Sequence, residues 1–317
     1  MYESFYGFHK PPFSNIPDPD FLFLSSQHKQ ALSILQYALM ARAGFCVITG
    51  NIGAGKTTLV RRMLQTLDNH VHVGLVSNTQ CETFEELLRW ILLAFELDYK
   101  NKDKVEMYDD FVQFLIRQYQ SGNPVTLIID EAQNLGLENL EQLRMLSNVN
   151  TEKGQILQVI LVGQPELWNL LRDPRLEQFA QRISYDYFLQ PLADADSIRQ
   201  YVQHRLTMAG GSETLFEPET FEPILEATRG VPRLINLLCD TALVYGYGES
   251  EKTIGIANIR RVIEDKQASF VPIGRDPSQP AVEPRSKPVV LTRKKNPKPP
   301  SDRASTIERA ARLRKNV

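Results

Sequence analysis

An eight-residue segment combines glycines, a lysine and a hydroxyl group in an order suited to phosphate binding. It lies between an apolar run and a helical pattern and reads Gly50-Asn51-Ile52-Gly53-Ala54-Gly55-Lys56-Thr57. Glycines let the backbone fold closely around a phosphate with several N–H groups pointing inward, and the helix that follows adds partial positive charge. We expect Lys56 to reach the β- and γ-phosphates of a nucleotide, Thr57 to coordinate Mg²⁺, and Thr58 to complete the binding segment. A glycine-rich turn with a coincidental lysine is the alternative.

Two adjacent carboxylates follow a second apolar run. Val125–Ile129 is followed at once by Asp130 and Glu131. Ligands bind at the carboxyl ends of the strands in open α/β sheets, so these acids should lie near the phosphate-binding segment. Asp130 would hold the metal ion and Glu131 would polarise the attacking water, because a carboxylate beside a metal cannot easily also accept a proton. An acidic pair that only favours a helix N-terminus is the alternative.

Short apolar, β-branched runs alternate with longer helical patterns over residues 25–270, which is typical of a parallel sheet covered by helices. The five expected strands are Phe45–Thr49, Val71–Ser77, Val125–Ile129, Ile156–Val162 and Ser184–Phe188. The expected helices between them are Thr57–Leu67, Phe84–Leu97, Tyr108–Tyr119 and Leu137–Val149. The sequence therefore predicts an α/β fold, a three-layer αβα sandwich of the P-loop NTPase type with a five-stranded parallel sheet.

After Pro191 the strand pattern stops. Only helical patterns follow, and they predict a small all-helical lid made of Ser197–Met208, Pro218–Thr228, Pro232–Tyr245 and Ile256–Ala268. The expected organisation is a linker over residues 1–25, a nucleotide-binding domain over 26–191, the lid over 192–270 and a tail over 271–317. In the linker, Phe13 and Ile16 are candidates for packing on adenine, although such side chains more often pack in a core.

Charge is divided unevenly between the body and the tail. The 317-residue chain has a formal net charge of −2, but Pro272–Val317 holds 12 Lys and Arg against 4 Asp and Glu, which leaves 24 against 34 elsewhere. This segment also contains 8 of the 19 prolines, so we expect it to be extended and disordered. Its basic clusters at 293–295 and 309–315 would suit DNA phosphates or an anionic membrane, and a solubilising extension is the alternative.

Composition excludes several classes of protein. Apolar residues make up 42% and charged residues 23%, so a collagen, a coiled-coil rod and a fully disordered chain are excluded. The sequence has no apolar run of about 18 residues and no pattern of a secretory signal. The distant Cys46, Cys81 and Cys239 fit a reducing compartment, and His70 and His72 lack a nearby third metal ligand. We expect a cytoplasmic protein that can bind peripherally to the inner membrane.

Five separated motifs occur in the order found in the AAA+ ATPases, which this sequence resembles. Within that family it is most similar to the ExeA/GspA group of bacterial general-secretion ATPases and to the related transposition ATPases. These motifs are GNIGAGKTT, LIIDEAQNL, VILVGQPEL, Gln181-Arg182-Ile183 and Gly230-Val231-Pro232-Arg233. The opening segment around Tyr6-Gly7-Phe8 and Pro12-Phe13 is also similar to that group, and the resemblance covers roughly residues 2–270. It implies an ATP hydrolase with ATP and Mg²⁺ as cofactors, which assembles with copies of itself into a ring or filament.

The resemblance also implies roles for four further polar residues. Gln164 occupies the sensor-1 position, where a side-chain amide can orient the hydrolytic water. Arg233 matches sensor 2 on the lid, and Arg182 matches the arginine finger that acts on a neighbouring subunit's nucleotide. Asn78 could restrain Glu131 until a partner binds.

Each of these residues also has a structural interpretation. Gln164 could begin a helix, Arg182 could belong to a surface ion-pair network, and Arg175 is its rival as the finger. Arg233 could be an ordinary residue at a helix start, but a cation there opposes the helix dipole, which favours a ligand role. Asn78 could be an ordinary turn residue.

Three functions remain open from the sequence. The first is an energy-coupling ATPase that assembles an envelope machine, such as a secretion or pilus system, with an unidentified protein partner. The second is a DNA-binding ATPase that recruits a transposase or a similar partner. The third is a scaffold that binds ATP and hydrolyses it negligibly, and the presence of Glu131 beside Asp130 argues against it.

Overall fold

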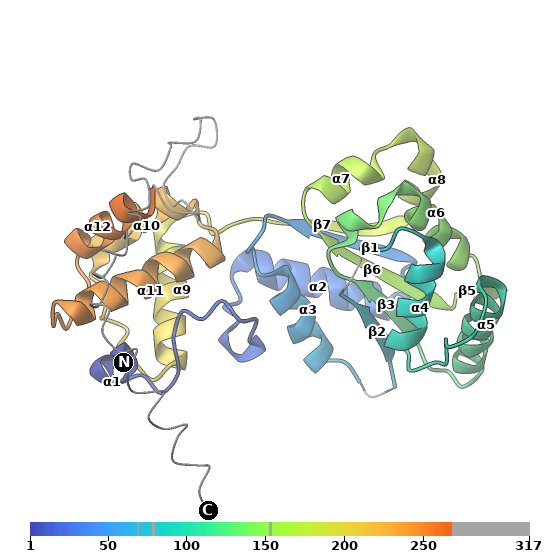
Figure 1. The fold of residues 1–317 in the computed structure, drawn as a ribbon, viewed down its shortest axis with the longest axis horizontal. Coiled ribbons are helices and arrows are strands. Elements are labelled where there is room, and N and C mark those ends of the chain that lie inside the picture. The colour runs from blue at the N-terminus through green and yellow to red at the C-terminus, as the bar shows by residue number, and fades with distance from the viewer. Residues whose placement is uncertain (69, 78–79, 152–153, 268–317) are drawn as a thin grey trace, which may run out of the picture. The chain divides into compact units, whose positions relative to one another are not determined.

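A parallel sheet forms the centre of the first part of the chain (Figure 1). The computed structural model describes residues 1–68, 70–77, 80–151 and 154–267. The strand order is β2-β3-β6-β1-β7, and every pairing is parallel. The strands are β1 (Phe45–Gly50), β2 (His72–Val76), β3 (Val125–Ile129), β6 (Leu157–Gly163) and β7 (Ile183–Leu189). All five expected strands are present, and the expected tail lies outside the described residues.

Helices cover both faces of this sheet, as the sequence predicts. One face carries α2 (Ser26–Met40) and α3 (Lys56–Gln65), and the other carries α4 (Phe84–Ala94), α5 (Lys104–Gln120) and α6 (Gly136–Leu146). In β1, Phe45 and Val47 pack in the core beneath α4, α5 and α6, whereas Cys46 and Ile48 pack in the core beneath α2 and α3. Because both faces are covered, β1, β3 and β6 are buried along their whole length.

Shorter elements complete this sandwich. The helices α7 (Glu166–Leu171) and α8 (Glu177–Ala180) add Leu167 and Phe179 to the core that α4, α5 and α6 share. A two-stranded antiparallel hairpin joins β4 (Asn150–Thr151) to β5 (Gly154–Gln155). These elements are short, and none of them was predicted from the sequence.

Polar residues mark the starts of the helices. Ser25 accepts a hydrogen bond from the backbone N–H of His28 at 3.3 Å, and so caps α2. Asp103 and Glu106 form a reciprocal capping box at the start of α5. Helix α5 therefore begins at Lys104, four residues before the expected Tyr108, because the cap rather than the apolar pattern sets the boundary.

The four expected helices of the lid region are present and share one core. They are α9 (Ala195–Met208), α10 (Phe221–Thr228), α11 (Pro232–Gly248) and α12 (Ile256–Gln267), with Pro218–Thr220 forming a separate 3₁₀ turn. The N-terminal segment joins this core through Phe8, Phe13 and Phe21, while α1 (Tyr2–Tyr6) packs beside α11. In the part of the chain that the structure describes, no helix is long and apolar enough to span a bilayer.

Gly230, between α10 and α11, occupies a position that excludes a side chain. Its φ is +70°, and an added Cβ would lie 1.9 Å from the backbone oxygen of Leu192. Replacing Gly230 with alanine should therefore lower the free energy of unfolding by about 3 kcal/mol or more, because strain and a backbone clash combine. Denaturant unfolding followed by circular dichroism measures this loss.

The matched control is Gly122→Ala. Gly122 has a similar φ of +79°, but an added Cβ would meet no atom within 4 Å. This variant should lose only about 1 kcal/mol, the cost of the left-handed conformation. Equal losses in the two variants would contradict the predicted clash at Leu192.

Candidate nucleotide-binding site

The phosphate-binding segment connects the end of β1 to the start of α3. Gly53 and Gly55 have φ of +79° and +95°, so both sit in the conformation that favours glycine. No side chain caps α3, whose first N–H groups therefore face the loop. A loop of this shape at a helix N-terminus provides the backbone donors that an anion requires.

Lys56 lies buried inside this loop. Its Nζ donates to the backbone oxygens of Gly50 at 2.7 Å and Asn51 at 3.0 Å. Burial lowers the pKa of Lys56, while the nearby carboxylates of Glu131 and Asp130 oppose that shift. An ammonium group has three donors, so Lys56 can brace the loop and still turn one donor toward a ligand.

Thr57 and Asp130 meet where β3 ends beside the loop. The Thr57 hydroxyl donates to Asp130 Oδ2 at 2.8 Å. A hydroxyl and a carboxylate are hard oxygen ligands, and Mg²⁺ commonly uses one or two such groups together with substrate phosphates and water. Among the described residues no group of three or more His, Cys, Asp or Glu could hold a metal, and His72 lies instead against Phe114. The donor set thus fits a magnesium ion shared with a nucleotide.

Glu131 is held by two side-chain amides. Its Oε2 accepts from Gln133 Nε2 at 2.6 Å and from Gln164 Nε2 at 3.0 Å. Burial alone would raise the pKa of Glu131, but these hydrogen bonds and the charge of Lys56 outweigh burial and leave it below its usual value. Glu131 is thereby kept as an ionised carboxylate beside the loop.

Gln133 is a site residue that was not predicted from the sequence. It also accepts from the backbone N–H of Gln164 at 3.0 Å through its Oε1, so a single amide links the ends of β3 and β6. The available signal was its place two residues after Glu131, because a short polar turn after a strand keeps its side chains at the same edge of the sheet.

One cavity of about 320 Å³ gathers most of the predicted residues. Its walls include the loop residues 52–58 together with Glu131, Gln164 and Arg233. The backbone N–H of Arg233 donates to the oxygen of Gly53 at 3.3 Å, and an added Cβ on Gly53 would lie 2.4 Å from Arg233 Cβ. Helix α11 therefore reaches the loop of its own chain, and the cavity size is in the range of small-molecule sites.

The N-terminal segment forms another wall of this cavity through residues 14–18 and 21–23. Of the two candidates for packing on adenine, Ile16 lines the cavity and is 77% exposed, whereas Phe13 is buried against Phe216 in the helical core. The buried guanidinium of Arg205 secures this segment by donating to Pro12 O at 2.6 Å and Ser14 O at 2.8 Å.

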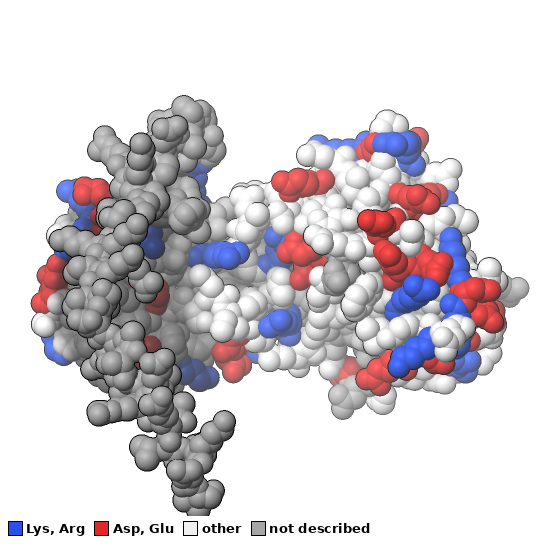
Figure 2. Space-filling model, in the orientation of Figure 1, with Lys and Arg blue, Asp and Glu red and all other residues white. Residues whose placement is uncertain are grey.

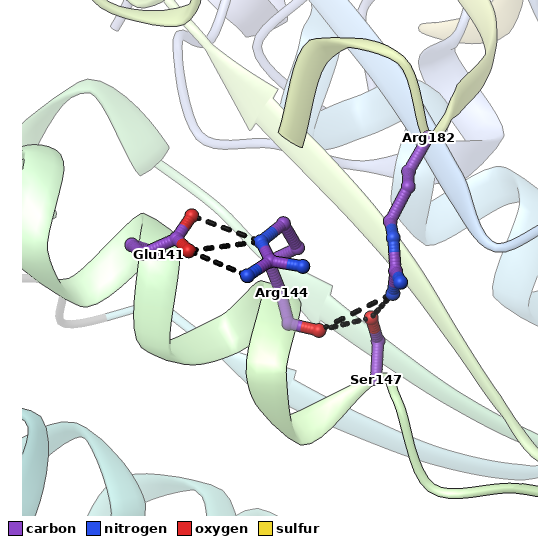
Figure 3. Close-up of polar contacts among 4 residues, drawn as sticks. All are labelled: Glu141, Arg144, Ser147 and Arg182. Carbon is purple, nitrogen blue, oxygen red and sulfur yellow. Dashed lines mark hydrogen bonds and ion pairs between the residues drawn. The ribbon is translucent and has the colours of Figure 1, made fainter. Parts of the chain in front are cut away.

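Arg182 lies away from this cavity. It directly precedes β7, so it stands at the amino ends of the parallel strands, while the loop lies at their carboxyl ends. Figure 3 shows its guanidinium against the end of α6, where it donates to Arg144 O at 3.4 Å and Ser147 Oγ at 3.3 Å. Arg175 instead pairs with Asp173 and is 73% exposed. Asn78 lies outside the described residues.

The fold and this site define a class. The P-loop, the paired acids and the helical group match AAA+ proteins, and the AAA domain family matches residues 39–171. This match confirms the resemblance to the AAA+ P-loop proteins.

Two curated relatives narrow this class. The chain is 38% identical to the general secretion pathway protein A of Aeromonas hydrophila over 80% of this chain and 46% of that protein. It is 28% identical to the ATP-dependent target DNA activator B of Escherichia phage Mu over 54% of this chain and 51% of that protein. The chain spans about half the length of these relatives, and the first comparison confirms its resemblance to the general-secretion group.

Solved structures agree on the fold. The ORC2 protein of Aeropyrum pernix superposes with a TM-score of 0.62 at 16% sequence identity, over 81% of this chain and 72% of that one. At this identity the match establishes a shared fold alone.

Proposed function

We propose that this protein binds Mg–ATP in the cavity between the sandwich and the helical group and hydrolyses it. The observation that carries this proposal is the convergence of Lys56, the Thr57–Asp130 pair and Glu131 at one edge of the sheet. Thr57 and Asp130 would hold the magnesium ion, which supplies charge neutralisation at the phosphates. Glu131 would accept the proton of the attacking water, and Gln164 and Arg233 would orient groups around it.

We further propose that hydrolysis drives assembly or partner remodelling in an envelope secretion or pilus-type system. The relation to general secretion pathway protein A supports this choice of system. Glu131 beside Asp130 favours turnover over a scaffold that only binds ATP. A cytoplasmic location suits Cys46 and Cys239, which are buried and form no disulfide, since a reducing compartment keeps thiols reduced.

The second candidate is an ATPase that acts on DNA, which the relation to the ATP-dependent target DNA activator B of phage Mu favours. Figure 2 shows acidic and basic side chains interspersed over the visible face of α4, α5 and α6. That face therefore offers no broad basic surface for DNA, and attraction of DNA would depend on other parts of the chain.

One experiment separates these candidates and tests turnover itself. The ATPase rate per subunit is measured against protein concentration, with and without double-stranded DNA at a fixed salt concentration. A rate that rises with concentration and ignores DNA supports the envelope function. A further rise with DNA supports the second candidate, and bound ATP without turnover would overturn hydrolysis.

Arg182 gives a prediction about self-assembly. Because it lies away from its own cavity, we expect it to complete the site of a second copy in a ring or filament. Arg182→Ala should leave the Kd for ATP unchanged and lower turnover by roughly 10³-fold, the usual range for such a residue.

Mixing tests this arrangement directly. Lys56→Met subunits lack their own nucleotide but retain Arg182, so adding them to Arg182→Ala subunits should restore part of the turnover. Arg175→Ala is the matched comparison and should turn over normally. Normal turnover of Arg182→Ala, or loss in Arg175→Ala instead, would contradict the assignment.

A further inference from the structure

His28 is a buried polar side chain behind the phosphate-binding loop. It lies on the first turn of α2, is only 4% exposed and lines the cavity. Its Nε2 is 3.2 Å from the backbone oxygen of Ala54, and its Nδ1 is 2.7 Å from Ser25 Oγ. Neither the phosphate-binding motif nor the roles assigned above use this residue.

The hydrogen bonds select one tautomer of the ring. A carbonyl oxygen can only accept, so Nε2 must carry the proton that is donated to Ala54. Burial lowers the pKa of His28, which keeps the ring neutral and leaves Nδ1 as an acceptor for the Ser25 hydroxyl. Ser25 thus both caps α2 and holds the ring in the form that can donate to the loop.

The contact between His28 and Ala54 O also fixes the direction of the Gly55 N–H, because both groups belong to the same planar peptide. In a trans peptide the carbonyl and the following N–H point in opposite directions, and the described chain contains no cis peptide bond. Fixing Ala54 O against His28 therefore turns the Gly55 N–H away from the ring. The ring also lies close to Gly55, because an added Cβ there would be 3.1 Å from His28 Nε2, a tight contact.

We propose that His28 is a positioning residue that orients the Gly55 N–H toward the phosphates of a bound nucleotide. The effect is exerted through the Ala54–Gly55 peptide, without contact between the ring and the reacting atoms. This inference rests on the proposed nucleotide binding, and it predicts an effect on affinity even without magnesium or turnover.

The test measures ADP binding to the full chain by calorimetry in the absence of magnesium. His28→Leu keeps a similar volume but removes the donor, and it should weaken ADP binding about fivefold to tenfold. His28→Gln places an amide nitrogen as many bonds from Cα as Nε2 and should bind within about twofold of the unmodified chain. Lys29→Ala, an exposed neighbour on α2, is the control and should bind ADP normally.

A third substitution of His28 separates loss of the donor from loss of folding. His28→Asn carries the same amide one bond shorter, so it should bind as weakly as His28→Leu while His28→Gln does not. Equal ADP affinity in all the His28 variants, even with lowered unfolding temperatures, would reduce His28 to a structural residue and overturn the proposal. Absence of ADP binding to the unmodified chain would overturn the proposed function itself.

Discussion

Replacing Lys56 with alanine should raise the Kd for ATP by roughly 100-fold or more. The variant loses a charged donor to the phosphates, and charge-assisted hydrogen bonds are among the strongest that a site can offer. It also loses the two hydrogen bonds that brace Gly50 and Asn51, so the loop itself is expected to relax. Equilibrium binding of a fluorescent ATP analogue measures the change.

Two further variants separate the charge from the rest of the side chain. Lys56→Met retains most of the aliphatic stem and should bind ATP as poorly as Lys56→Ala. Arg62→Ala removes a cation from the same helix without touching the cavity, and its affinity should stay normal. Near-normal affinity in Lys56→Ala would refute the phosphate-binding role.

Replacing Glu131 with glutamine should preserve ATP binding and lower turnover by roughly 10²- to 10⁴-fold, the range of a lost general base. The amide oxygen of glutamine can accept from Gln133 and Gln164 as the carboxylate does, so the site should keep its shape. Steady-state turnover and ATP affinity, measured on the same preparation, separate the two effects.

The matched control for Glu131→Gln is Glu138→Gln. It makes the same chemical change at an exposed position on the first turn of α6, where no role in the site is assigned. This control should turn over ATP at the normal rate. Substantial turnover in Glu131→Gln would mean that another group activates the water.

Local signals explain why much of the site could be predicted from the sequence. A phosphate-binding loop needs its glycines and lysine at fixed spacing between a strand and a helix, so the segment Gly50–Thr57 could be identified from the sequence alone. The two acids follow an apolar strand directly, and a parallel sheet brings the ends of β1 and β3 to one edge. These contacts follow from the order of elements alone.

The contacts that were missed depend on tertiary packing. His28 and Ala54 are 26 residues apart and meet only because α2 lies behind the loop. Phe13 could have faced either adenine or a core, and the choice depends on Phe216, which lies in another part of the chain. The role of Arg205 could not be predicted for the same reason, since its partners are backbone carbonyl groups that no side-chain pattern reveals.

The contacts of the N-terminal segment limit how this protein can be truncated into fragments that still fold. A chain begun at residue 39, where the match to the AAA domain begins, would lack all but the last two residues of α2 and with them Ala31 and Leu35 of the sandwich core. It would also leave the Arg205 guanidinium without Pro12 and Ser14, and a buried charge without its partners is costly. The start of the matched domain is therefore not a folding boundary, and we expect an independently folding fragment to need α2 and the N-terminal segment around Pro12 and Ser14.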